Sequence, residues 1–122
     1  AAEAPVIVVA AEDAPAERER ALEAAGVRVL HAPEGVERTL ETLRQAGIRS
    51  MFVEGGASVA GSLLRAEVVD RLYLLYAPLF LGPGGLSPFA ALESPPIAEA
   101  ARWRRVATEA FGADTLVTLA RG

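Results

Sequence analysis

The chain has 122 residues and a net charge of −4, and 52% of its residues are apolar. This predicts one ordinary globular domain, without the basic surface that nucleic-acid binding requires. With no cysteine and a single histidine, His31, the sequence excludes disulfides and a cysteine nucleophile, and we expect no metal site.

The N-terminus carries no signal-peptide pattern, and no apolar stretch reaches the length of a membrane span. We therefore expect a cytoplasmic protein that has no membrane partner.

Short apolar runs alternate with amphipathic segments through the first half of the chain. The pattern predicts strands at residues 5–11, 27–32 and 48–54, and helices that follow Asp13, run over 36–46 and run over 57–65. Asp13 is the expected cap of the first helix, and Gly26 and Gly47 are the expected stops of the first two. Such alternation favours a largely parallel sheet.

The second half of the chain has a different pattern. A long apolar run predicts a strand at residues 68–80, followed by a glycine-rich loop and an irregular stretch at 87–99. Residues 103–111 and 114–121 flank Gly112-Ala113 and predict an antiparallel hairpin. Together the elements predict an α/β fold, with a mixed, mainly parallel sheet of about six strands flanked by helices and a C-terminal hairpin.

The most informative motif is the glycine pair Gly55-Gly56, expected between a strand and a helix. Ligands of open α/β sheets bind at the carboxyl ends of strands, and a helix start offers free N–H groups to an anion. The amides of Ala57, Ser58 and Val59 and the hydroxyls of Ser58 and Ser62 are the candidate donors. Ala60 and Gly61 are small enough for close packing against the sheet or a ligand.

Two common phosphate motifs do not fit this segment. Gly56 and Gly61 have the glycine spacing of a P-loop, but Ser62 stands where that motif requires lysine. The dinucleotide fingerprint requires spaced glycines in the first strand–helix unit, whereas these are adjacent and lie in the third. The pattern predicts a backbone anion site that suits a pyrophosphate.

Residues 53–85, VEGGASVAGSLLRAEVVDRLYLLYAPLFLGPGG, closely resemble the reductase domain of the bifunctional riboflavin-biosynthesis deaminase/reductase. The matching features are Glu54-Gly55-Gly56, Gly61, Val69-Asp70, Ala77-Pro78 and Leu81-Gly82. The resemblance implies a dihydrofolate-reductase-like fold that uses NADPH and no metal. It also implies hydride reduction of a ribose carbonyl in a phosphoribosylaminopyrimidine substrate.

The resemblance also implies roles for individual residues. Glu54 would contact the ribose region of the substrate. The cofactor phosphates would lie against Gly55, Gly56, Ala57, Ser58, Val59, Ala60, Gly61 and Ser62. No catalytic residue is assigned, because Glu54 is the one candidate general acid and its protonation state does not follow from sequence. We expect a homodimer.

The chain departs from this family in length. It begins near a middle strand of the reductase domain, so we expect a single domain over residues 1–122 that lacks its N-terminal part. The residues present include no zinc deaminase half, which requires His and Cys ligands. Two alternatives remain open: another dihydrofolate-reductase-like enzyme acting on a pterin or pyrimidine, and a non-catalytic oligomerisation module.

Overall fold

The computed structural model describes residues 4–90 and 92–122. The chain divides into two compact units, Ala1–Phe52 (unit 1) and Val53–Gly122 (unit 2), and each is described by itself. The prediction that residues 1–122 form a single domain stays a prediction.

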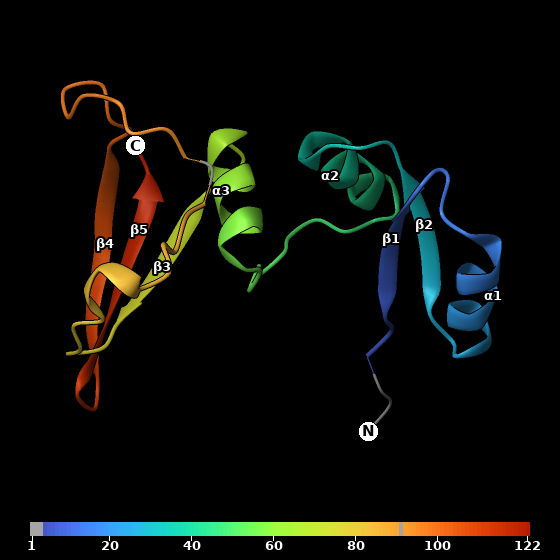
Figure 1. Ribbon diagram of the computed structural model, residues 1–122, viewed down its shortest axis with the longest axis horizontal. Helices are drawn as coiled ribbons and strands as arrows, with labels where there is room; N and C mark the ends of the chain where they lie inside the picture. The colour runs from blue at the N-terminus through green and yellow to red at the C-terminus, as the bar shows by residue number, and fades with distance from the viewer. Residues whose placement is uncertain (1–3, 91) are drawn as a thin grey trace. The chain divides into compact units, whose positions relative to one another are not determined.

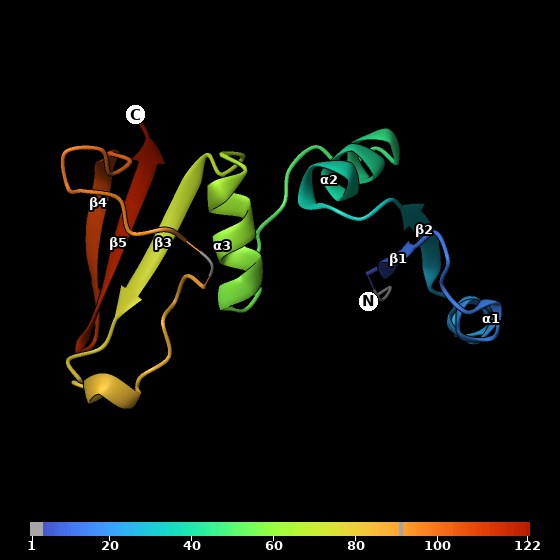
Figure 2. The same ribbon diagram turned by 45° about the horizontal axis from the view of Figure 1, so that its top comes forward.

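Unit 1 is a parallel strand pair with a helix on each side. β1 (Ile7–Ala11) and β2 (Arg28–Ala32) pair in parallel, with Ile7 opposite Arg28 and Ala11 opposite Ala32. Their connection is α1 (Ala16–Ala24), and α2 (Val36–Gln45) follows β2. The two helices lie on opposite sides of the strand pair (Figures 1 and 2). The two elements after β1 and β2 therefore leave the sheet in opposite directions.

Both helices of unit 1 end as the sequence predicts. At the end of α1 the Gly26 N–H donates to the Glu23 carbonyl and the Val27 N–H to the Leu22 carbonyl, at 2.9 and 3.0 Å. This is the Schellman arrangement, and it needs a residue with positive φ, which Gly26 supplies at 80°. Gly47 ends α2 with the same pair of bonds.

The prediction that Asp13 caps α1 is wrong. The residue at the cap position is Pro15, and no side-chain hydrogen bond caps the helix. Asp13 lies instead in a turn closed by the Ala14 N–H, which donates to the Ala11 carbonyl at 3.1 Å. That turn separates Asp13 from the first helical amides.

The prediction of a strand over residues 48–54 is also wrong. The segment has no strand assignment, and all its residues except Ile48 are exposed. In the described part of the chain β1 pairs with β2 alone, and residues 48–54 pair with neither sheet. The boundary between the two units falls within this segment.

Unit 2 is an antiparallel sheet with one α-helix. It contains α3 (Ala57–Arg65), β3 (Arg71–Tyr76), the short 3-10 helix η1 (Gly82–Gly84), β4 (Trp103–Phe111) and β5 (Asp114–Arg121). The strand order is β3-β5-β4, and Figures 1 and 2 both show α3 beside β3. Because β5 is central, its Thr118 is buried, with 6% of its surface exposed.

The predicted hairpin is confirmed with its bounds. β4 and β5 pair from Phe111 opposite Asp114, and Gly112 has the positive φ of 60° that suits the first position of a two-residue hairpin loop. The predicted strand at 68–80 is shorter than expected, because β3 ends at Tyr76, before Ala77-Pro78. Proline offers no N–H to a strand ladder, which explains the end.

The α/β fold class with helices and a C-terminal hairpin is confirmed. The parallel part is smaller than expected, since it consists of the β1–β2 pair, and the described strands number five rather than six. The sixth predicted strand is the segment 48–54, which joins neither sheet.

Candidate functional site

The start of α3 presents free backbone donors. Gly56 is the residue before the helix, and its carbonyl accepts the Ala60 N–H at 3.1 Å. The amides of Ala57, Ser58 and Val59 precede this first helical bond, so they have no intrahelical acceptor. No side chain caps the helix. Three N–H groups are thus available where the helix dipole is positive, which is the arrangement that binds anions.

The two glycines before α3 differ in the space around them. A Cβ built on Gly56 meets no atom within 4 Å, whereas one built on Gly55 comes within 2.8 Å of the Val59 side chain. The backbone of Gly56 is ordinary extended chain, with φ −67° and ψ 177°. Gly56 is therefore required neither by packing nor by its own conformation, and the space beside it is open to a ligand.

Gly61 has a different environment. It is buried, and a Cβ at this position would overlap the carbonyl oxygen of Ala90. The same crossing segment is fixed by the Ala90 N–H, which donates to the Ala57 carbonyl at 3.1 Å. Gly61 thus allows the segment that contains Ala90 to cross α3 closely. The space beside its Cα is filled by the backbone of Ala90.

The other predicted site residues also divide by exposure. Glu54, Gly55, Gly56, Ser58 and Val59 are exposed, whereas Ala57, Ala60 and Ser62 are half-buried. The structure therefore leaves the loop and the first turn of α3 accessible and covers part of the second turn. Glu54 lies in the segment that does not form a strand, so strand alternation gives no direction for its side chain. Its substrate-contacting role stays a prediction from the family resemblance.

The charge at the start of α3 differs from that of the other two helices. The first turn of α1 contains Glu17 and Glu19, and the first turn of α2 contains Glu37. The first turn of α3 contains no acid. A carboxylate within the first turn would compete with a bound anion, so the first turn of α3 leaves its amides to a ligand, although Glu54 stands two residues before Gly56.

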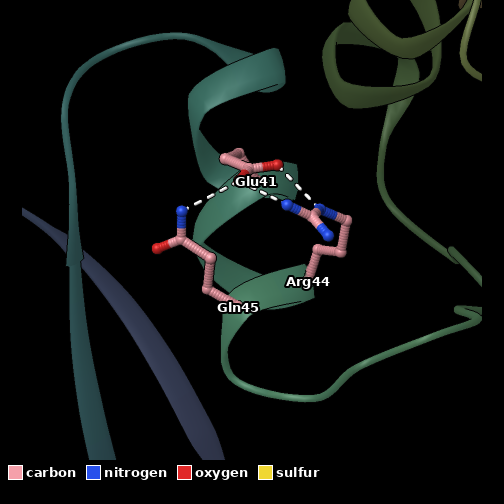
Figure 3. Close-up of polar contacts among 3 residues, drawn as sticks. All are labelled: Glu41, Arg44 and Gln45. Atoms are coloured by element: carbon pink, nitrogen blue, oxygen red, sulfur yellow. Dashed lines mark hydrogen bonds and ion pairs between the residues drawn. The ribbon is translucent and has the colours of Figure 1, made fainter.

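The clearest electrostatic perturbation lies away from this site, on the exposed face of α2. Arg44 and Gln45 both donate hydrogen bonds to the Glu41 carboxylate at 2.8 Å (Figure 3). These bonds, that from Arg44 first, lower the pKa of Glu41 from 4.5 to about 2. Their spacing of three and four residues identifies them as pairs that support the helix itself.

Sequence reasoning missed a second concave region, which lies in unit 1. We call it the acidic hollow; it has a volume of about 570 Å³ and is lined by Val9, Ala10, Ala11, Glu12, Asp13, Ala32, Pro33, Glu34, Gly35 and Thr39. The available signal was an acid within two residues of the end of each of the first two strands, Glu12 and Glu34. The glycine motif pointed instead to the end of the predicted third strand.

Residues 4–90 and 92–122 contain no group of three or more His, Cys, Asp or Glu that could hold a metal ion. Within the same ranges, no helix has both the length and the apolar character of a membrane span.

The sequence model of the RibD C-terminal domain family matches residues 1–117. Over 83 residues the chain is 35% identical to the 2,5-diamino-6-ribosylamino-4(3H)-pyrimidinone 5′-phosphate reductase of Aquifex aeolicus, covering 66% of this chain and 37% of that protein. It is 36% identical over 92 residues to the riboflavin biosynthesis protein RibD of Bacillus amyloliquefaciens, covering 70% of this chain and 24% of that protein. The chain thus corresponds to a part of these relatives.

Solved structures show the same fold. A structure of RibD from Acinetobacter baumannii superposes with a TM-score of 0.78 at 24% identity, covering 94% of this chain and 30% of that one. A pyrimidine reductase-like protein from Corynebacterium diphtheriae gives a TM-score of 0.72 at 21% identity, covering 93% of this chain and 49% of that one. The expected reductase-domain fold is confirmed by both.

Proposed function

The chain belongs to the RibD C-terminal domain family, and from this we propose that it is a reductase domain of riboflavin biosynthesis. The proposed reaction reduces the ribose carbonyl of 5-amino-6-(5-phosphoribosylamino)uracil to the ribityl product. The reductant is a nicotinamide dinucleotide, NADPH being the form that the family resemblance implies. The observation that carries the proposal is the match over residues 1–117, with the Gly55-Gly56 pair before an uncapped helix.

A bound dinucleotide would supply the hydride, which adds to the carbonyl carbon while the carbonyl oxygen takes a proton. The contribution of this chain is positioning. The amides of Ala57, Ser58 and Val59 fit a pyrophosphate, because they are donors that cannot be neutralised by a change of pH. The open space at Gly56 lets an anion approach them closely. Glu54 is the proposed contact to the substrate ribose.

The test is Gly56→Val, assayed by titration with NADPH and with NADH. Because a Cβ built on Gly56 meets no atom within 4 Å, we expect the variant to fold and to bind both dinucleotides at least about tenfold more weakly. Circular dichroism and a thermal scan verify that folding is unchanged. Undiminished binding in a folded variant would refute the phosphate site at α3.

A second assay tests the reaction itself. Oxidation of the reduced dinucleotide is followed with 5-amino-6-(5-phosphoribosylamino)uracil, and then with pterin and pyrimidine alternatives. Turnover with the first substrate alone supports the proposal, whereas turnover with a pterin favours the alternative reductase. A chain that binds neither dinucleotide would favour the non-catalytic module.

The proposal includes a cytoplasmic homodimer. Large apolar side chains are exposed on unit 2, among them Leu75, Leu79, Phe80, Leu81 and Phe111. Side chains of this kind in one unit are typical of surfaces that become covered on association. Light scattering coupled to size exclusion tests the dimer, and cell fractionation tests the location.

A further inference from the structure

One face of the antiparallel sheet in unit 2 exposes apolar side chains from both outer strands. Residues directly opposite each other in such a sheet point to the same side, so the register assigns each side chain to a face. We call this side the open face; it consists of Arg71, Tyr73 and Leu75 of β3, Asp114, Leu116, Thr118 and Ala120 of β5, and Arg104, Ala107, Glu109 and Phe111 of β4. Leu75 and Phe111 are 63% and 59% exposed. Apolar side chains this exposed on a regular sheet indicate a surface that a partner covers.

The charges of the open face are separated by sign along the strands. Arg71 and Arg104 lie on either side of Ala120, in one row across the sheet. Asp114 lies at the other end of β5, about 20 Å from Ala120 at about 3.4 Å per residue. Glu109 lies on β4, toward the same end as Asp114. The open face therefore has a basic end, an acidic end and an apolar middle.

These four charged side chains are available to a partner. Among the described residues, no ion pair joins any of them to the rest of the chain. Two nearby arginines differ, because Arg121 pairs with Glu67 and Arg105 donates to the Thr108 hydroxyl at 3.4 Å. Arg105 also lies on the opposite face, since successive residues of a strand alternate. The charges left for contacts outside the chain are thus those of the open face.

A second copy of the chain matches this charge pattern in one orientation. Two-fold symmetry brings the same patch of two copies together, and aligned packing is a common way for two sheets to cover each other. If the strands of the two copies ran in the same direction, the two arginine rows would face and repel each other. If they run in opposite directions, each basic end faces an acidic end, Arg104 of one copy lies near Glu109 of the second copy, and the apolar middles meet.

We propose that the open face is the interface of a two-fold symmetric dimer, in which the strands of the two copies run antiparallel and Arg104 of each copy pairs with Glu109 of the other. The inference rests on the homodimer of the proposed function and deepens it, because it specifies the surface, the orientation and the pairing residues. Tyr73, Leu75 and Phe111 provide the apolar contact, and the charges fix the register.

The test measures the dimer dissociation constant of the full chain by sedimentation velocity over a dilution series. Arg104→Glu and Glu109→Arg each bring like charges together at two symmetric positions, so each should weaken the dimer at least about tenfold. The double variant Arg104→Glu/Glu109→Arg exchanges the charges and should return the dissociation constant to within about threefold of the wild type. Arg105→Glu is the matched control: it makes the same charge change at the adjacent position on the opposite face and should leave the dimer unchanged.

The outcomes separate this inference from the proposed reaction. Circular dichroism verifies that each variant is folded, and NADPH binding of the wild type tests the reductase proposal independently of the dimer. Recovery in the double variant supports the pairing, because a second substitution does not reverse a loss of shape. A dimer that neither single substitution weakens, or one that the double variant does not restore, would overturn the inference and leave the homodimer standing. A wild-type chain that stays monomeric would overturn both, while NADPH binding would still support the reductase.

Discussion

α2 and α3 begin alike and are stabilised differently. Each follows a glycine that provides no side-chain cap, Gly35 for α2 and Gly56 for α3. α2 contains no buried residue and carries its own polar pairs, whereas α3 buries Gly61 and Leu63. α2 therefore depends more on local side-chain interactions, and α3 on contacts with distant parts of unit 2.

The same comparison applies to ligands. The start of α2 borders the acidic hollow and has Glu37 in its first turn, while the first turn of α3 has no acid. An uncapped helix start thus indicates an anion site only when the surrounding charges permit it. The two glycine-led helices of this chain therefore begin in different charge environments, one beside several acids and one without an acid in its first turn.

The strongest test of the packing contrast is Gly61→Ala. Alanine stabilises a helix interior by about 1 kcal/mol relative to glycine, but here the added methyl overlaps the Ala90 carbonyl, and overpacking costs up to about 3 kcal/mol. We expect the free energy of unfolding to fall by about 2 kcal/mol, measured by urea denaturation. Gly56→Ala is the matched control, which should change it by less than about 0.5 kcal/mol. A stable Gly61→Ala would show that the crossing segment does not hold α3.

The contrast in charge is tested by Ser58→Asp, which gives α3 the acidic first turn of α2. Acid near a helix start stabilises the helix by about 0.3–1 kcal/mol, so the protein should become no less stable. Dinucleotide binding should weaken at least tenfold, about 1.4 kcal/mol, through repulsion of the phosphates. Ser58→Asn keeps the size without the charge and should bind nearly as the wild type does. Equal weakening in both variants would point to shape rather than charge.

A substitution at the end of α3 should change the free energy of unfolding less than the substitutions above. α3 ends with the same bonds as α1, but the residue with positive φ is Glu67, at 58°, and its carboxylate forms an ion pair with Arg121 at 2.6 Å. A left-handed non-glycine residue costs about 1 kcal/mol, and an exposed ion pair contributes less than about 1 kcal/mol. Glu67→Gly and Glu67→Ala both remove the pair, but only glycine relieves the strain. The glycine variant should be about 1 kcal/mol more stable than the alanine variant by urea denaturation, and equal stabilities would contradict the strain.

How far sequence could predict this molecule depended on the range of the interactions. The hairpin and the helix stops at Gly26 and Gly47 were predictable, because a turn residue and its neighbours determine them. The strand at 48–54 was not, because the apolar pattern of a segment does not show whether a strand distant in sequence will pair with it. Gly56 and Gly61 look alike in sequence, and only the position of Ala90 separates an open glycine from a packed one.

The acidic hollow was missed for a similar reason. Glu12 and Glu34 are far apart in sequence and come together because β1 and β2 are parallel and adjacent. The sequence predicted both strands, and ligands of open α/β sheets are known to bind at the carboxyl ends of strands. It did not show that the helices after them lie on opposite sides of the strand pair.

The local character of α2 can be tested by the titration of Glu41. Its pKa of about 2 in the folded chain lies below the ordinary value of 4.5, because Arg44 and Gln45 donate hydrogen bonds to the ionised form. A depressed pKa stabilises the fold above the unfolded value, so this support is present above pH 4.5 and is lost as the pH falls toward 2. Carboxyl NMR should give a Glu41 midpoint near 2 in the wild type and a clearly higher one in Arg44→Gln. An Arg44→Gln midpoint that stays near 2 would contradict the assignment of the lowered pKa to the Arg44 hydrogen bonds.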